Sequence, residues 1–412
     1  MIYFVILFLM IYLSYQYDIL GKTNNKEFWY RLLLIAFILI AGLRYRLGGD
    51  TINYLKYFYY EIPYLWDISK EDLFSGTEPL FLLLNSVVKS LGLKFFVVQL
   101  IQALIVNGLL FAFIKKHSLY PFTCILFYSF YMYFFYNFEE LRASISIVIC
   151  LFANDYILDR KWFKGFALYF LGTMFHYSTI LLFITPLFLF LKMNIVGASF
   201  ILLSLFVALI LQAKLGDYLF LFELNNSVAD KMSGYVDSDV FFKRNITIRS
   251  ILFSNIPYFI YSAFAILFLK RIRNNMELLN LQPFLVLGLI FVVMSIPVPV
   301  FYRFVHFYAI YFVLFFTYLF IELIKGSKGI TTSLAVMRTC VLFIPFFLLA
   351  VRNIRSPFVS NADAGLSSKS AQQYYNYQKY YPYSSVIERS LDEEREKLYK
   401  SDGHDVANRS QY

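Results

Sequence analysis

Residues 95–114 read FFVVQLIQALIVNGLLFAFI and are followed directly by Lys115 and Lys116. None of the side chains in this stretch carries a charge. A helix of this length reaches roughly 30 Å, which is the thickness of the hydrocarbon core of a bilayer. The stretch therefore predicts a membrane-spanning helix with basic residues at one end.

Similar apolar runs recur along the chain. Of its 412 residues, 59% are hydrophobic and only 16% are charged, which is unlike a soluble protein. We predict an all-α, polytopic helical membrane protein with about twelve transmembrane segments. The first run lacks a basic n-region and a small-residue cleavage site, so we expect it to be retained as a helix. The predicted spans are 2–17, 28–43, 95–114, 121–138, 143–158, 163–175, 179–191, 195–211, 251–269, 283–298, 304–324 and 334–351.

Lysine and arginine side chains are concentrated in alternate loops. By the positive-inside rule we assign these loops to the cytoplasm, which leaves both termini outside. Residues 163–191 must then cross the membrane twice with a turn near His176, either as two short spans or as a broken pair of half-helices. The loops assigned to the cytoplasm are 21–27, 115–120, 159–164, 192–194, 270–282 and 325–330.

A transmembrane catalytic domain is predicted over residues 1–351, with external segments attached to it. The loop 44–94 contains an apolar helix, 80–91, that is too short to span and is expected to be interfacial or re-entrant. A second external loop covers 213–249. Residues 352–412 form a tyrosine-rich external tail with a charged terminal helix.

Ionisable residues gather at the external ends of the predicted spans. Residues 44–50, RYRLGGD, place arginines, glycines and a carboxylate at the mouth of an apolar run. Arginine presents a planar fork that matches phosphate oxygens, and glycine lets backbone N–H groups approach a ligand. We expect this face to form one cavity that binds a pyrophosphate-bearing lipid. Its members are Arg44, Arg46, Asp50, Glu78, Glu139, Arg142, His176, Arg303 and His306.

Each of these features also has a simpler interpretation. Arg44 and Arg46 can snorkel to lipid headgroups, and a histidine such as His306 can simply be hydrogen-bonded to a neighbour. Tyrosines belong to interfacial belts in membrane proteins in general. The gathering of arginines, carboxylates and histidine on one face favours a ligand site.

The sequence gives no support to the common classes of soluble enzyme. It has no phosphate loop and no dinucleotide fingerprint, and its three cysteines stand at unrelated spacings. Four histidines are too scattered for a zinc or iron site, so we expect no metal and no cofactor. The net charge of +10 comes largely from the loops assigned to the cytoplasm, so no nucleic-acid partner is implied.

Five short motifs carry a resemblance to a known family. They are 42–50, GLRYRLGGD, with Tyr54; 78–81, EPLF; 141–145, LRASI; 175–178, FHYS; and 381–384, YPYS. In this order they resemble the EpsG-like membrane proteins of bacterial exopolysaccharide and capsule loci, which are related to Wzy-type polysaccharide polymerases. Ala143 stands where that family commonly has glutamine, which leaves one ligand hydrogen bond in doubt, and the tail continues beyond the closing P-Y element.

The resemblance implies a GT-C-like multispan fold and a lipid-linked sugar substrate. We expect metal-independent glycosyl transfer at the outer leaflet of the bacterial inner membrane, with the site facing the periplasm or exterior. Undecaprenyl-pyrophosphate-linked oligosaccharide would be donor and acceptor, polymerised into exopolysaccharide, capsule or O-antigen. Membrane lipids, a flippase and a chain-length regulator are the other expected partners.

Roles for individual residues follow from this chemistry. Arg142 and Arg303 are expected to stabilise the leaving pyrophosphate, assisted by Arg44 or Arg46. His176 is the first choice for the base that activates the acceptor, and Asp50 is the second. The remaining predicted substrate-binding residues are Tyr54, Glu78, Glu139, Tyr177 and His306.

Two other functions use similar residues. A transporter or flippase of lipid-linked oligosaccharide also needs arginines in a membrane cavity, but on both leaflets or at the midplane. A membrane O-acyltransferase also uses an intramembrane histidine, although its acyl donor is usually cytoplasmic. The gathering of arginines on one predicted face favours glycosyl transfer.

Overall fold

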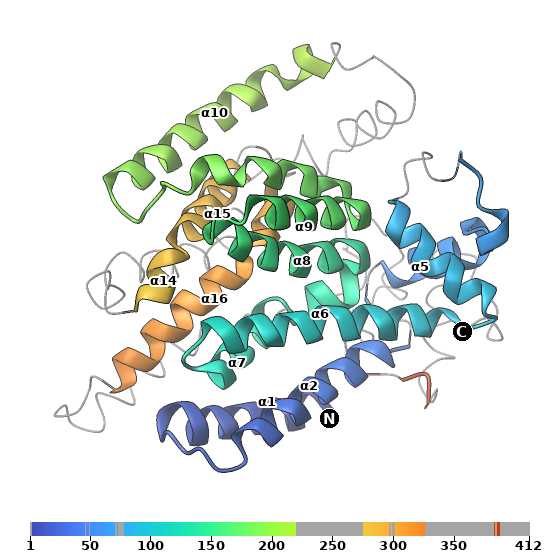
Figure 1. Cartoon of the computed structure of the whole chain (residues 1–412), viewed down its shortest axis with the longest axis horizontal. Coiled ribbons are helices and arrows are strands. Elements are labelled where there is room, and N and C mark those ends of the chain that lie inside the picture. The colour runs from blue at the N-terminus through green and yellow to red at the C-terminus, as the bar shows by residue number, and fades with distance from the viewer. Residues whose placement is uncertain are drawn as a thin grey trace, which may run out of the picture.

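The computed structural model is a bundle of helices (Figure 1). It describes residues 2–45, 47–48, 50–70, 72, 78–219, 275–295, 298, 301–325, 383 and 385–387, with only the backbone at residues 52 and 209–219. All regular elements within these ranges are helical, which confirms the predicted all-α class.

The centre of the bundle consists of helices that run alongside one another. The helix α8 (Leu141–Leu158) packs against α9 (Trp162–Phe175), α6 (Phe95–His117) packs against α2 (Lys26–Gly42), and α15 (Gln282–Met294) packs against α16 (Tyr302–Lys325). The other elements are α1 (Ile2–Leu13), η1 (Ser14–Ile19), α3 (Thr51–Lys56), η2 (Tyr57–Glu61), η3 (Leu65–Asp67), α5 (Pro79–Ser90), α7 (Pro121–Tyr131), η4 (Phe135–Glu139), η5 (Tyr177–Phe188), α10 (Ile195–Leu219) and α14 (Met276–Asn280).

Most of the predicted spans correspond to these helices. Among the described residues, four segments are long and apolar enough to cross a membrane: Ile2–Ile19, Phe95–His117, Leu141–Leu158 and Tyr302–Lys325. The other predicted spans within these ranges overlap α2, α7, α9, η5, α10 and α15. The predicted spans 251–269 and 334–351 lie outside the described residues, as do the rest of 220–274 and the predicted tail helix. The count of about twelve spans and the GT-C-like fold remain predictions.

One predicted span is interrupted, and one predicted break between spans is present. Residues 121–138 form the short helix α7 and then the π-helical segment η4, rather than one continuous helix. Residues 163–191 break at His176, which has extended backbone angles between α9 and the 3₁₀-helical segment η5. The structure therefore confirms the predicted break and shows both arms to be short, at about 21–24 Å each.

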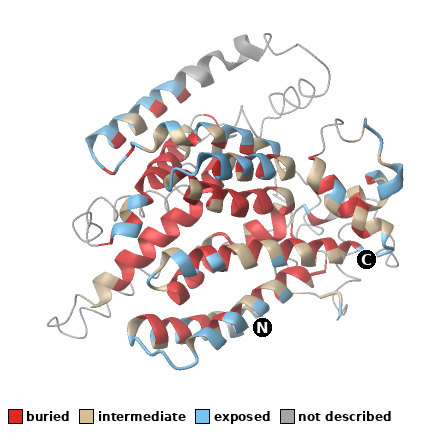
Figure 2. Ribbon diagram, in the orientation of Figure 1, coloured by how far each residue is buried: buried red, intermediate tan, exposed pale blue. Residues whose placement is uncertain are grey.

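Buried polar side chains join the central helices. Figure 2 shows that α8 and α16 are buried over most of their length. The Gln102 amide on α6 donates to the Tyr136 carbonyl at 2.9 Å and to the Ser144 hydroxyl at 2.8 Å. Hydrogen bonds of this kind fix the packing of helices when the surrounding lipid offers no partners.

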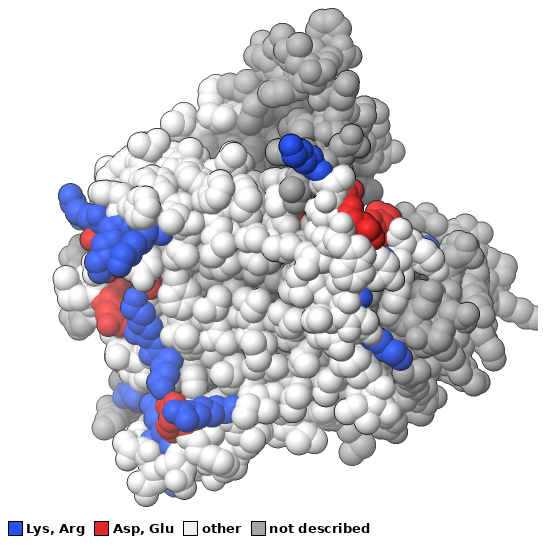
Figure 3. Space-filling model, turned by 45° about the vertical axis from the view of Figure 1, so that its right-hand side comes forward, with Lys and Arg blue, Asp and Glu red and all other residues white. Residues whose placement is uncertain are grey.

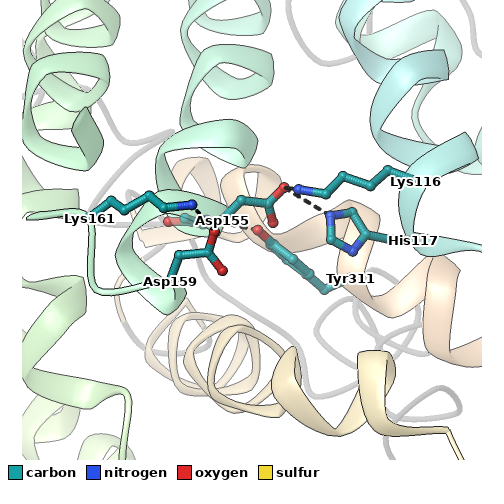
Figure 4. Close-up of polar contacts among 7 residues, drawn as sticks. Lys116, His117, Asp155, Asp159, Lys161 and Tyr311 are labelled. Atoms are coloured by element: carbon teal, nitrogen blue, oxygen red, sulfur yellow. Dashed lines mark hydrogen bonds and ion pairs between the residues drawn. The ribbon is translucent and has the colours of Figure 1, made fainter.

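One end of the bundle is rich in basic side chains. In Figure 3, lysines and arginines gather along one edge, and a broad belt without charged side chains separates them from the other edge. Lys116 and His117 both contact the Asp155 carboxylate, at 2.7 and 2.9 Å (Figure 4). Lys115 pairs with Glu27 at 2.6 Å. Loops that were all assigned to the cytoplasm thus meet at the same end of the bundle.

The loop after α2 lies directly against η4. Gly48 has a φ of +102°, and a Cβ atom at this position would lie 2.1 Å from the carbonyl oxygen of Phe138. Glycine is required here for both its backbone conformation and its lack of a side chain. Gly92 also has a positive φ, +68°, but no atom lies within 4 Å of its Cβ position.

We predict that Gly48→Ala is much more destabilising than Gly92→Ala. The alanine at position 92 meets only the conformational cost of the left-handed region, about 1–2 kcal/mol. The alanine at position 48 also displaces the Phe138 carbonyl, so it should lower the melting temperature of the purified protein further and reduce its accumulation in the membrane. Equal effects of the two substitutions would contradict the close contact at Gly48.

Candidate active site

A single carboxylate brings together residues from three separate motifs. Glu78, which is only 4% exposed, stands immediately before α5. Its Oε2 accepts a hydrogen bond from Arg142 Nη1 at 2.6 Å, and its Oε1 lies 3.1 Å from His176 Nδ1. Since these residues come from α5, the start of α8 and the turn after α9, the contacts join three elements at one end of the bundle.

The local sequence explains how these side chains are positioned. Pro79 occupies the first turn of α5, where its missing N–H costs nothing, and it leaves Glu78 in the extended conformation before the helix. The His176 turn is held against α8 because the hydroxyls of Ser146 and Thr179 share a hydrogen bond. At Gly172 a Cβ atom would lie only 3.0–3.1 Å from side chains of both elements, so the glycine allows the close approach.

The Arg142 side chain is held by aromatic rings as well as by Glu78. Its guanidinium carbon lies 5.7 Å from the centre of the Tyr54 ring and 5.9 Å from that of Phe81, and its Nε is 3.4 Å from the Tyr54 hydroxyl. Tyr54 and Phe81 pack edge to face at 5.8 Å. The Arg142 side chain is still 35% exposed, so a ligand can reach part of the guanidinium.

The electrostatics keep Glu78 ionised. Burial raises the pKa of this carboxyl, but the hydrogen bond from His176 and the charge of Arg142 outweigh burial and hold the pKa below its ordinary value of 4.5. Burial raises the pKa of Tyr54 to about 12, so this phenol stays protonated at neutral pH. The charge of Arg142 lowers the pKa of Tyr54, and the charges of Glu140 and Asp50 raise it.

The structure therefore brings together Tyr54, Glu78, Arg142 and His176 from the predicted set. Asp50 is exposed just before α3, and Tyr177, which is 40% exposed, follows His176 directly. Glu139 is buried at the end of η4, and Arg303 is half-buried in the first turn of α16. Arg46 lies outside the described residues. Roles in substrate binding or catalysis for these residues stay predictions.

His306 is placed differently. It is buried on α16, where its ring stacks on Phe135 with ring centres 3.9 Å apart and meets Tyr302 edge to face at 4.7 Å. The hydrogen bonds at Glu78 do not include His306. These contacts give it a role in packing, and the predicted role in substrate binding has no support from them.

Arg44 is also held by the protein itself. Its side chain is fully buried, it donates to the carbonyl of Ala41, and its guanidinium lies 5.0 Å from the centre of the Phe138 ring. Its backbone forms an antiparallel bridge with Ser385, and Val386 N donates to the Leu43 carbonyl at 2.9 Å. These contacts make Arg44 an anchor for residues 383 and 385–387, which we call the C-terminal clasp. Its predicted role in substrate binding stays untested.

Sequence reasoning missed two features of this region. Phe81, one turn into α5, supports both Tyr54 and Arg142, and its position three residues after Glu78 is the signal that could have identified it. The clasp joins residues more than 340 positions apart, as in the hydrogen bond from the Tyr383 hydroxyl to the Ile40 carbonyl at 3.1 Å. Among the described residues, no three histidine, cysteine or acidic side chains are grouped closely enough to hold a metal ion.

Comparison with known proteins gives one match. The model of the family described as EpsG family matches residues 27–384. The matched region includes Tyr54, Glu78, Arg142 and His176, which we call the Glu78 site. It also includes Tyr383 of the C-terminal clasp. No curated protein and no solved structure matches the chain.

We predict that Glu78→Gln lowers the stability of the protein by about 1–3 kcal/mol. This is less than the loss of a fully buried ion-pair partner causes, because Arg142 is partly exposed and glutamine keeps some hydrogen bonding. The pKa of Glu78 in the folded state lies below its unfolded value of 4.5, so its stabilisation is complete above that pH and is lost as the pH falls through the folded pKa.

The melting temperatures of wild type and Glu78→Gln should therefore differ above about pH 5 and converge in more acidic buffer. Glu27→Gln is the control, because Glu27 pairs with Lys115 and Arg31 on the exposed surface at the opposite end of the bundle. It should change the melting temperature little. A difference at Glu78 that stays constant down to pH 3 would contradict the role of its charge.

Proposed function

The chain belongs to the EpsG family, and on this premise we propose that it is a membrane glycosyltransferase that polymerises lipid-linked oligosaccharide. The repeat units, carried on undecaprenyl pyrophosphate, would be joined into exopolysaccharide, capsule or O-antigen. One observation carries the proposal: an ionised Glu78 holds a partly exposed arginine and a histidine side by side. This arrangement provides a binding group for an anionic leaving group next to a proton acceptor.

Arg142 binds the pyrophosphate of the donor. When the bond between the sugar and the lipid pyrophosphate breaks, negative charge develops on the leaving oxygens. A fixed guanidinium stabilises this charge without having to reorganise, because Glu78, Tyr54 and Phe81 already hold it in place. Arginine also offers two parallel N–H groups, which suit a phosphate better than the single ammonium of lysine.

His176 accepts the proton of the acceptor hydroxyl. With Nδ1–H donating to Glu78 Oε1, the lone pair of Nε2 is the one available for a substrate. The acceptor oxygen attacks the anomeric carbon of the donor, the bond to the lipid pyrophosphate breaks with its electron pair, and the proton moves to Nε2. The lipid pyrophosphate leaves as an anion beside Arg142. Asp50, whose backbone carbonyl accepts a hydrogen bond from Tyr54 N at 3.1 Å, is the second candidate for the base.

Neighbouring groups complete the proposed site. The neutral phenol of Tyr54 and the exposed ring of Tyr177 suit sugar hydroxyls and the apolar faces of sugar rings. The site lies at the end of the bundle opposite the basic loops, which by the positive-inside rule is the outer face of the bacterial inner membrane. A flippase that delivers repeat units to this face and a regulator of chain length are the partners that we propose for this reaction.

We predict that two arginine substitutions separate binding from stability. Arg142→Lys keeps the charge but loses the fork, so it should weaken donor binding and polymer formation roughly ten- to a hundredfold, as expected for about 1.5–3 kcal/mol of charged hydrogen bonding. Arg44→Lys removes contacts of a fully buried side chain, so it should lower the melting temperature while the activity per folded molecule stays close to normal. The opposite pattern would assign the ligand to Arg44.

We predict that His176→Gln abolishes chain extension but not donor binding. Glutamine resembles histidine in size and hydrogen bonding but cannot take a proton, and loss of a general base typically costs about 10² to 10⁴ in rate. His117→Gln is the matched control, because His117, the last residue of α6, pairs with Asp155 at the opposite end of the bundle. Both purified variants are supplied with lipid-linked repeat units after their folding has been checked by thermal melting. Normal extension by His176→Gln would transfer the role of base to Asp50, whose asparagine variant should then be inactive.

A further inference from the structure

Four large apolar side chains are exposed where α5 ends. They are Leu65 (43% exposed), Trp66 (70%), Leu91 (67%) and Leu93 (43%), and we call them the apolar tip. Figure 2 shows exposed residues at this end of the α5 region. Large apolar side chains that are exposed together on a packed element indicate a contact with a partner or a membrane.

The apolar tip is held in place by hydrogen bonds between residues 59–66 and the end of α5. The backbone N–H of Leu65 donates to the Ser90 hydroxyl at 2.7 Å. The Lys89 ammonium donates to the carbonyls of Ile62 and Tyr59, at 2.5 and 3.1 Å, and lies 5.3 Å from the centre of the Tyr64 ring. These contacts hold residues 59–66 against the end of α5, so the exposed side chains of both segments are kept together.

The position of the apolar tip identifies what covers it. The helix α5 ends at Ser90, and the chain turns at Gly92, with hydrogen bonds from Gly92 N to Lys89 O and from Leu93 N to Val88 O. The span α6 begins three residues after Gly92, at Phe95. The 23 residues of α6 reach about 34 Å, slightly more than the roughly 30 Å of the hydrocarbon core. The start of α6 therefore lies at the edge of the hydrocarbon region, and the tip lies at the same level.

We propose that the apolar tip is a lipid-contact surface, in which Leu65, Trp66, Leu91 and Leu93 insert into the interfacial region of the bilayer. Tryptophan is enriched at this depth because its ring is apolar and its N–H is polar. Lys94 directly follows Leu93 in the sequence and is exposed, and its ammonium group suits the phosphates of lipid headgroups.

The lipid contact has a consequence for the Glu78 site. The 12 residues of α5 form a rigid rod of about 18 Å, with Glu78 before its first residue and the apolar tip at its other end. Anchoring the tip in the bilayer sets the position of Glu78 relative to the lipid surface. Only this consequence rests on the proposed reaction, because the contact itself requires no chemistry.

Tryptophan fluorescence tests the contact directly. The chain has three tryptophans, so Trp29→Phe combined with Trp162→Phe leaves Trp66 alone. The variant is placed in nanodiscs that contain phosphatidylcholine brominated near the glycerol end of its acyl chains. We expect brominated lipid to quench most of the Trp66 emission and iodide in the buffer to quench little. Quenching by iodide without quenching by brominated lipid would overturn the proposal and assign the tip to water or to a glycan.

A second variant provides the reference. Trp29→Phe with Trp66→Phe leaves Trp162, which opens α9 at the opposite end of the bundle and is 41% exposed, so it reports an interfacial tryptophan in the other leaflet. If the first double variant does not fold, Trp66→Phe in the otherwise native chain gives the answer by difference. The Trp66→Phe substitution should remove the part of the tryptophan emission that brominated lipid quenches. An unchanged quenching curve would again overturn the proposal. Neither readout depends on activity, so failure here leaves the reaction at Glu78 untouched.

Discussion

A carboxylate buried at the end of a membrane helix bundle needs partners, because an unpaired buried charge is strongly unfavourable. Glu78 satisfies this requirement with both of its oxygens, one facing Arg142 and the other facing His176. Each partner comes from a different helical element. Because the buried carboxylate has to be paired, it fixes how α5, α8 and the turn after α9 meet. The same pairing orients a guanidinium and an imidazole toward one place, so the structural constraint and the proposed chemistry have a common origin.

A second set of contacts connects the mouth of α2 to this site. Arg44 is anchored between Phe138, the Ala41 carbonyl and the C-terminal clasp, and Gly48 allows the following loop to lie on the end of η4. The loop leads directly into α3, which carries Tyr54 to the side of Arg142. Arg44 at the end of α2 thus supports the position of Arg142 at the Glu78 site.

The sequence predicted the parts of this structure that depend on local pattern. Apolar runs predicted the helices, and the polar break at His176 predicted the interruption between α9 and η5, because an ionisable residue within apolar sequence rarely continues a span. The gathering of Glu78, Arg142 and His176 could be expected from their shared place at span ends. The family match over residues 27–384 confirms the resemblance carried by the five motifs.

Other features could not be predicted, since their cause is tertiary. The close approach of η4 to Gly48 and the hydrogen bonds of the clasp both join residues far apart in the chain. The burial of Arg44 could not be predicted for the same reason. An arginine at a helix end has the same local sequence whether it faces a ligand or anchors a distant segment.

We propose that the Glu78 site catalyses glycosyl transfer between lipid-linked sugars. The most direct measurement of this reaction uses the purified protein in proteoliposomes with undecaprenyl-pyrophosphate-linked repeat units as the only substrate. Released undecaprenyl pyrophosphate and new glycosidic bonds are counted in the same sample. We expect a ladder of longer glycans and one lipid pyrophosphate released for each bond formed. Movement of intact lipid-linked units across the bilayer, with neither product formed, would contradict the proposal and indicate a transporter.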